Sequence, residues 1–139
     1  MTDRTQTAAL EAFTRRMFTR IIVALSHTLR DEDLSVAQVA ALYLLDERGR
    51  LRVGEVAEVI GRPLPQASRL VDDLVQRGLV LRVEDEQDRR ARVLSLSAKG
   101  RAFIARTGED RVQTILGAGA SLPKDVAARM FQAVTGRSR

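Results

Sequence analysis

The chain has 139 residues, 45% of them hydrophobic and 4% aromatic, with a formal net charge of +5 and neither tryptophan nor cysteine. This composition suits one compact domain with an aliphatic core, and it excludes thiol switching and cysteine-ligated zinc. The longest apolar run near the N-terminus, residues 21–25, is too short for a secretory or transmembrane segment, so we expect a cytoplasmic protein.

The N-terminal segment, residues 1–30, predicts a long helix. Apolar side chains recur every three or four residues along it, and two more widen the stripe: Leu10, Phe13, Met17, Ile21, Leu25 and Leu29, with Phe18 and Ile22. The stripe is wider than one small lobe needs to cover, which favours a dimerisation helix. An intramolecular bundle is the alternative.

No catalytic or metal-binding constellation is apparent. His27, the only histidine, lies among apolar residues, where a packed or pocket-edge imidazole is favoured over a general base. The acidic run Asp31-Glu32-Asp33 is compatible with a hard cation, but a solvated turn is the preferred interpretation. We therefore expect neither an enzyme nor a bound metal or cofactor.

The next segment carries a helix start signal. Ser35 and Gln38 have the spacing of a capping box, and Leu34 with Val39 supplies a hydrophobic staple. These residues predict a helix from Val36 to about Glu47 that serves as scaffold.

Residues 51–78 have the pattern of a helix-turn-helix. A short helix from Val53 is predicted to end at Gly61, and residues 51–53 are compatible with a small third strand. A second helix, Leu64 to Arg77, has one apolar face (Ala67, Leu70, Val71, Leu74 and Val75) and one polar face (Gln66, Arg69, Asp73, Gln76 and Arg77).

The second helix has the chemistry of a recognition helix. In a helix-turn-helix the second helix enters the major groove and its first turn faces the base edges. Glutamine suits adenine, arginine suits guanine or phosphate, serine suits either, and a proline ring can touch a thymine methyl group. We expect DNA contacts from Arg62, Pro65, Gln66, Ser68, Arg69 and Arg77. A polar surface helix without a DNA partner is the alternative.

A strand, a charged loop and a second strand follow Gly78. Leu79, Leu81 and Val83 alternate with Val80 and Arg82, the polar run 84–91 interrupts the pattern, and residues 93–96 resume it. We expect acidic residues near the strand ends to hold some arginines by pairing, so that Arg89 or Arg90 at the tip reaches a narrow minor groove, with Asp88 beside them. A solvated hairpin with ordinary surface ion pairs is the alternative.

The C-terminal segment, residues 98–139, predicts two more dimerisation helices. Ser97 can cap a helix that continues until the run 117–120 interrupts it, and Leu122-Pro123 restarts a last helix. Their apolar residues include Ile115, Leu116, Val126, Met130, Phe131 and Val134.

Arginine dominates the basic residues. Only Lys99 and Lys124 are lysines, so 21 of the 23 basic side chains are arginine, which suits phosphates and bases, although a GC-rich genome would give the same bias. Residues 62–77 carry a net charge of +1 and residues 78–97 carry none. The placement of single arginines therefore carries more weight than the total charge.

The run from Asp88 to Gly100, DRRARVLSLSAKG, resembles the wing signature of the MarR family of bacterial transcriptional regulators, with Ser97 where the family usually has threonine. Residues 68–74 and 77–80 resemble the family's recognition helix and the turn into its wing. One departure is the turn Arg62-Pro63-Leu64-Pro65, where relatives commonly have Ser, Thr or Asp as the helix cap.

The resemblance implies a mainly α fold with a small β wing (α+β), in which a single domain of residues 1–139 contains a winged helix-turn-helix lobe over residues 35–97. It also implies a homodimer that binds double-stranded DNA at a pseudo-palindromic operator, as a ligand-responsive repressor. Small aromatic or phenolic effectors of the family suggest a pocket near Phe18, His27 and Tyr43. The alternative function is a winged-helix module that binds protein instead of DNA.

Overall fold

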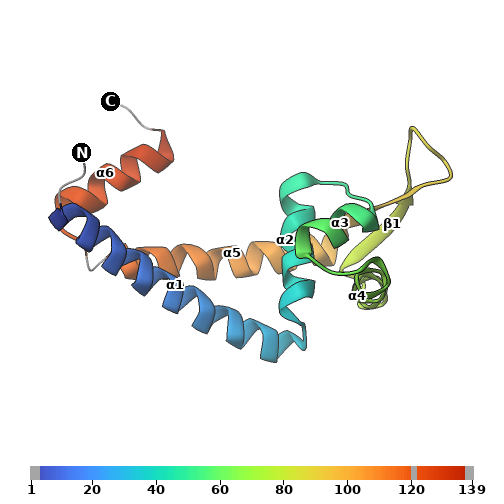
Figure 1. The fold of residues 1–139 in the computed structure, drawn as a ribbon, viewed down its shortest axis with the longest axis horizontal. Coiled ribbons are helices and arrows are strands. Elements are labelled where there is room, and N and C mark those ends of the chain that lie inside the picture. The colour runs from blue at the N-terminus through green and yellow to red at the C-terminus, as the bar shows by residue number, and fades with distance from the viewer. Residues whose placement is uncertain (1–3, 120–121, 137–139) are drawn as a thin grey trace. The chain divides into compact units, whose positions relative to one another are not determined.

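The computed structural model describes residues 4–119 and 122–136, apart from the side chains of residues 6, 115, 118 and 119. In chain order the elements are α1 (Arg4–Glu32), α2 (Val36–Arg48), α3 (Val53–Ile60), α4 (Leu64–Gln76), β1 (Val80–Glu84), β2 (Arg92–Leu96), α5 (Ala98–Gly119) and α6 (Lys124–Thr135) (Figure 1). The predicted fold class, mainly helical with a small β wing, is confirmed.

The chain divides into two compact units. One unit is Thr28–Gly108, and the other consists of the residues before and after it, so the predicted lobe of residues 35–97 lies inside the first of these. Within the described ranges, every helix is too short or too polar to cross a membrane.

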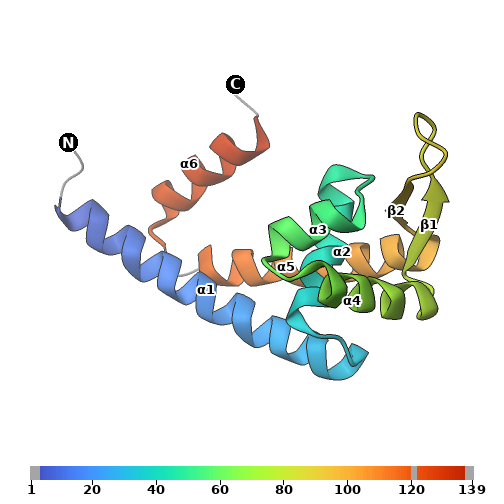
Figure 2. The same ribbon diagram turned by 45° about the vertical axis from the view of Figure 1, so that its right-hand side comes forward.

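The unit Thr28–Gly108 is built around an aliphatic core. Its most deeply buried side chains come from α2, α3, α4 and both strands: Leu42, Leu45, Leu74, Leu94, Val56, Val71 and Val80. The β1–β2 hairpin projects beyond α2, α3 and α4 (Figures 1 and 2). This arrangement leaves α4 and the hairpin tip accessible on the surface of one unit.

Local signals explain where α2 begins and where α3 ends. The Ser35 hydroxyl accepts the Gln38 N–H, and the Gln38 side chain accepts the Ser35 N–H, so the predicted capping box is confirmed. Gly61 ends α3 in the left-handed conformation at φ 65°, which glycine adopts without steric cost.

The proline-rich turn still begins a helix. Pro63 occupies the N-cap position, and its carbonyl oxygen accepts the N–H groups of Gln66 and Ala67, both at 3.0 Å. Pro65 lies in the first helical turn, where its missing N–H removes no helical hydrogen bond. The recognition helix therefore starts at Leu64, and Arg77 caps its other end.

The hairpin differs from the predicted alternation. Val80 pairs with Leu96 and is 1% exposed, whereas Leu81 is 48% exposed. The reason is that Leu79, whose N–H bonds to the Leu74 carbonyl, belongs to the turn that closes α4 and is not part of the strand. The inward positions of β1 are therefore shifted by one residue from the pattern of leucines.

The predicted third strand is reduced to one bridge. Leu51 exchanges two backbone hydrogen bonds with Leu94, at 3.1 and 2.7 Å, and Val53 already begins α3. Later in the chain, α5 continues through Gly117 to Gly119, slightly beyond the predicted interruption. The last helix starts after Pro123 as expected.

Candidate nucleic-acid interface

The outward face of α4 carries most of the predicted base-facing residues. Pro65, Gln66 and Arg69 are exposed and Ser68 is half-buried, while the opposite face is buried in the core of the unit. Residues 65 and 69 are one helical turn apart, so their side chains lie on the same side of the helix. The first two turns of α4 thus present an amide, a hydroxyl and a guanidinium together.

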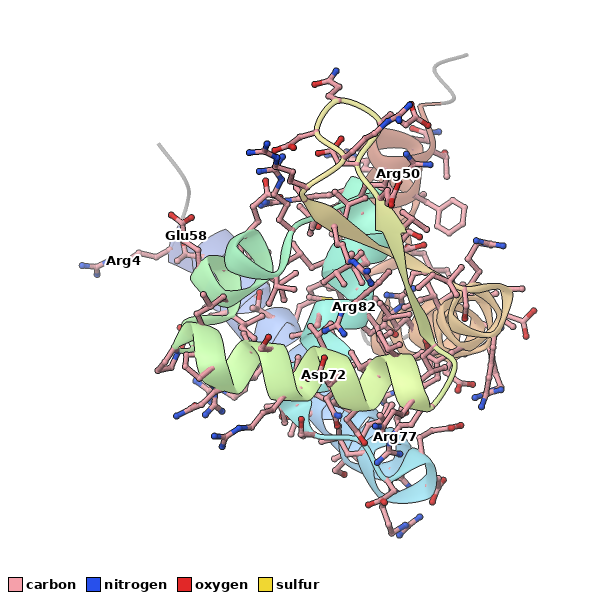
Figure 3. All side chains as sticks on the ribbon, turned by 90° about the vertical axis from the view of Figure 1, so that its right-hand side faces the viewer. Arg4, Arg50, Glu58, Asp72, Arg77 and Arg82 are labelled. Carbon is pink, nitrogen blue, oxygen red and sulfur yellow. The ribbon has the colours of Figure 1, made fainter. Side chains whose placement is uncertain are left out.

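An acidic residue on this face is paired with the wing. The Arg82 guanidinium on β1 donates to the Asp72 carboxylate on α4, and Figure 3 shows the two side chains facing each other. An unpaired carboxylate here would repel phosphate. The pairing offsets that charge and joins the hairpin to α4.

The wing tip is shaped by Asp88. Its carboxylate accepts the Arg90 N–H at 3.1 Å, and its carbonyl oxygen accepts the Ala91 N–H at 3.0 Å. This tight turn leaves the side chains of Arg89 and Arg90 exposed. Neither guanidinium has an ion pair within 4 Å in the part of the chain that the structure describes.

The acidic wing residues pair with arginines that precede the helix-turn-helix, which corrects the expectation that they hold arginines of the wing. Asp85 binds Arg52 at 3.0 Å, and Glu86 binds Arg50 at 3.4 Å. The pKa of Asp85 is lowered, first by the hydrogen bond from the Gln87 N–H and then by Arg52. Spacing in sequence gave no signal for these pairs, because their partners are more than 30 residues apart.

Arg77 is held by partners within the chain. Its guanidinium binds Asp73 at 2.8 Å and Asp33 at 3.6 Å, and it donates to the Glu32 carbonyl at 3.2 Å. These contacts fasten the C-terminal end of α4 to the turn between α1 and α2. We therefore exclude Arg77 from the proposed DNA contacts, whereas Arg62 is exposed in the turn before α4 and stays among them.

Gln38 joins the same network, a role that the sequence pattern did not indicate. While its side-chain oxygen completes the capping box, its Nε2 donates to Asp73 at 2.5 Å. The pKa of Asp73 is lowered, first by this hydrogen bond and then by the hydrogen bond from Arg77. The i,i+4 spacing of Asp73 and Arg77 is a signal from which their ion pair could have been predicted, but no comparable signal exists for Gln38.

Most predicted dimerisation side chains are exposed in the single chain. Phe13 is buried and Met17 is half-buried, and the Ile115 side chain lies outside the described part. The exposed ones are Leu10, Ile21, Leu116, Val126, Met130 and Phe131. Exposed apolar side chains in this number are typical of a surface that another chain covers.

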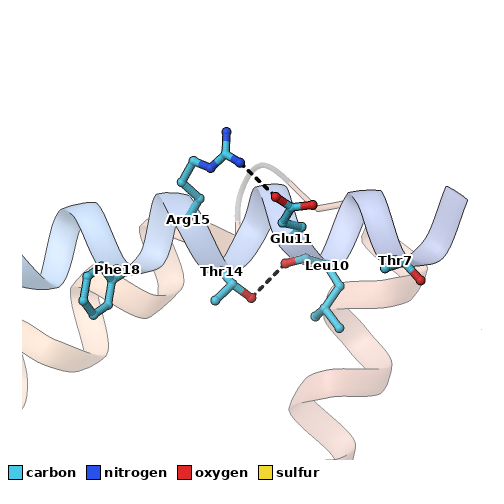
Figure 4. Close-up of a pocket in the computed structure, with 6 residues that line it drawn as sticks. All are labelled: Thr7, Leu10, Glu11, Thr14, Arg15 and Phe18. Atoms are coloured by element: carbon cyan, nitrogen blue, oxygen red, sulfur yellow. Dashed lines mark hydrogen bonds and ion pairs between the residues drawn. The ribbon is translucent and has the colours of Figure 1, made fainter. Parts of the chain in front are cut away.

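The three residues of the predicted effector pocket belong to different parts of the fold. Phe18 lines an open pocket along α1 with Leu10 and Thr14, and the ion-paired Glu11 and Arg15 line the same pocket (Figure 4). His27 is exposed and is in the same unit. Tyr43 lies in the other unit, and its hydroxyl donates to the Thr107 hydroxyl at 2.6 Å.

Among the residues described, no three His, Cys, Asp or Glu side chains are grouped as metal ligands would be. The acidic run at residues 31–33 instead supplies partners for arginines, since Glu32 binds Arg106 and Asp33 binds Arg77.

Comparison with known proteins identifies the helix-turn-helix segment. A family model described as MarR family matches residues 32–91. A curated relative, the uncharacterized HTH-type transcriptional regulator YfiV of Bacillus subtilis (strain 168), is 36% identical over 72 residues. The match covers 52% of this chain and 45% of that relative, so the chain spans less than half of the relative's length.

The fold similarity extends further along the chain. The transcriptional regulator Tm0710 from Thermotoga maritima has a TM-score of 0.75 at 26% identity, over 93% of this chain and 91% of that one. The MepR–DNA complex of S. aureus has a TM-score of 0.70 at 19% identity, over 88% of this chain and 92% of that one. The second similarity concerns the fold alone.

Proposed function

We propose that the chain, which matches a MarR family model over residues 32–91, is a transcriptional regulator of that family and binds double-stranded DNA as a homodimer. One observation carries the proposal. The wing tip presents Arg89 and Arg90 without an ion-pair partner among the described residues, while the nearby acids Asp85 and Glu86 are paired.

We propose that α4 enters the major groove and that the wing tip enters the adjacent minor groove. Gln66, Ser68 and Arg69 read base edges from the exposed side of α4, and Arg62 contacts phosphate. Arg89 and Arg90 reach the minor groove, where the negative potential favours arginine. Asp88 holds the turn that aims them.

The homodimer rests on the exposed apolar side chains of α1, α5 and α6. A two-fold dimer presents two recognition helices, so its operator is a pseudo-palindrome with half-sites about one DNA turn, roughly 34 Å, apart. Occupying such a site in a promoter represses transcription. We place the protein in the cytoplasm, where its DNA would be.

We further propose that a small aromatic or phenolic effector loosens DNA binding. Such a ligand acts by favouring a dimer in which the spacing of the two recognition helices no longer matches the operator. Ligand control and repression are the finer parts of the proposal, and each needs its own measurement after DNA binding is established.

The test measures the affinity of the protein for DNA fragments from the region upstream of its own gene at increasing salt concentrations. Affinity should fall steeply with salt, because several phosphates release counterions. Arg89→Ala with Arg90→Ala should weaken binding by roughly tenfold or more and reduce the salt slope by about one unit per arginine that contacts phosphate, with the dimer intact.

The matched control is Arg15→Ala with Arg16→Ala, which removes the same charge from neighbouring positions on α1. This control should keep nearly all of the affinity. If no fragment shows salt-sensitive binding, the DNA-binding proposal is contradicted and the protein-binding alternative is favoured. Equal losses in the two double variants would show that only total charge matters.

A further inference from the structure

The first turn of the recognition helix presents hydrocarbon to solvent. Leu64, the first residue of α4, is 55% exposed, and Pro65 beside it is also exposed. Neither side chain is needed for the core of the unit, which α4 reaches through Ala67, Val71 and Leu74. The exposed leucine therefore stands at the position of α4 that the proposed function brings nearest to the bases.

The same turn has lost most of its hydrogen-bond donors. A helix start ordinarily offers several free N–H groups, which suit a phosphate. Here Pro63 and Pro65 have no N–H, and the Gln66 N–H donates to the Pro63 carbonyl oxygen, which leaves the Leu64 N–H. Pro63 also provides no side-chain cap. This end of the helix is therefore poorly suited to a phosphate and well suited to an apolar group.

The major groove offers one apolar group on its base edges, the C5-methyl group of thymine. Leu64 lies one helical turn before both Ser68 and the buried Ala67, so it stands at the edge between the two faces of α4, and Pro65 lies one turn before Arg69 on the face of the polar readers. We propose that Leu64, supported by Pro65, reads a thymine methyl group in each half-site and so determines specificity at that base pair. The proposal rests on DNA binding by α4 as described above.

The experiment replaces thymine by deoxyuridine, which removes only the methyl group. An operator is first selected from genomic fragments with the full chain, and each thymine of its half-sites is then replaced in turn. Burial of one methyl group corresponds to about a fourfold change in affinity, and to roughly sixteenfold when both half-sites are altered. We expect one thymine in each half-site to show this loss.

The contact is assigned to Leu64 by combining the base change with a protein change. In Leu64→Ala the same deoxyuridine replacement should have no effect, because the methyl group has already lost its partner. Val36→Ala is the matched control, since Val36 is an exposed aliphatic residue at the first position of α2. It should keep the full fourfold loss.

Three outcomes separately contradict the methyl contact, its assignment to Leu64, and DNA binding itself. If no half-site thymine responds to deoxyuridine in the wild-type protein, the methyl contact is absent, and this arm does not depend on any variant folding. If the loss persists in Leu64→Ala, another residue makes the contact. If no fragment is selected at all, the proposed DNA binding itself fails, and the methyl contact fails with it.

Discussion

The hydrogen bond between Gln38 and Asp73 provides a sharp test of how the recognition helix is held. Gln38 is buried, its oxygen completes the capping box of α2, and its amide donates to Asp73 at 2.5 Å. Gln38→Glu keeps an acceptor for the capping box, since glutamate serves there as well as glutamine. It replaces the donor facing Asp73 by a second carboxylate.

The expected cost has two parts. Losing a hydrogen bond to a charged group costs about 1.5–3 kcal/mol, and two carboxylates about 4 Å apart repel by about 1 kcal/mol in a water-like setting. The Asp73 side chain is 42% exposed, so solvent screens both effects and the low end applies. We expect the free energy of unfolding to fall by about 2–3 kcal/mol, which lowers Tm by about 8–12 °C for a chain of this size.

The pH dependence has a definite sign. The pKa of Asp73 in the folded protein lies below its usual value of 3.8, so its stabilisation is fully present above that value. The stabilisation is lost as the pH falls through the lowered folded pKa. In Gln38→Glu the two facing carboxylates raise at least one pKa, and the destabilisation should therefore shrink as the pH is lowered from 7 toward 4.

The measurement is thermal unfolding followed by circular dichroism at one fixed protein concentration, because unfolding of a dimer depends on concentration. Gln38→Glu with Asp73→Asn is the rescue, since the new amide at position 73 can donate to the new carboxylate at position 38. The reasoning is refuted if Gln38→Glu is as stable as the wild-type protein at pH 7. It is also refuted if the double variant is no more stable than the sum of the single effects predicts.

Two further predictions concern backbone fit and the wing. Gly100→Ala places a Cβ atom against the Leu79 carbonyl oxygen and should lower the free energy of unfolding, measured by chemical denaturation, by roughly 3 kcal/mol or more. Gly54→Ala has open space around it in α3 and should raise that free energy by about 0.5–1 kcal/mol. Equal effects of the two substitutions would refute the packing argument. Arg52→Ala should weaken operator binding by about two- to fivefold because Asp85 loses its partner at the wing root, and reversing both charges should restore affinity in the same binding assay.

The sequence was most informative where a local signal coincides with the final structure. The capping box at Ser35 and the glycine at position 61 act within one helical turn, so their effects could be predicted without knowledge of the fold. The helix α4 was also predicted, because its apolar face repeats over three turns. Its predicted start at Leu64 is confirmed, although Pro63 at the N-cap has no side-chain acceptor.

The sequence was less informative where tertiary contacts determine which side chains are buried or paired. Leu79 and Leu81 look alike in an alternating pattern, but only Leu79 is buried, because the turn after α4 uses it before the strand begins. The pairing of Arg52 with Asp85 joins residues 33 positions apart, so no periodicity reports it. Such pairs follow from the fold and cannot be read from spacing.

The distribution of ion pairs explains how the nearly neutral segment of residues 62–97 could attract DNA. Residues 62–97 contain six acidic residues, and four of them, Asp72, Asp73, Asp85 and Glu86, are paired with arginines. Two of those arginines, Arg50 and Arg52, come from outside the segment. In the same described range, the arginines without an ion pair are Arg62, Arg69, Arg89, Arg90 and Arg92. Paired charges largely cancel beyond about 8 Å at physiological salt, so these five arginines, and not the net charge, should set the salt dependence of DNA binding.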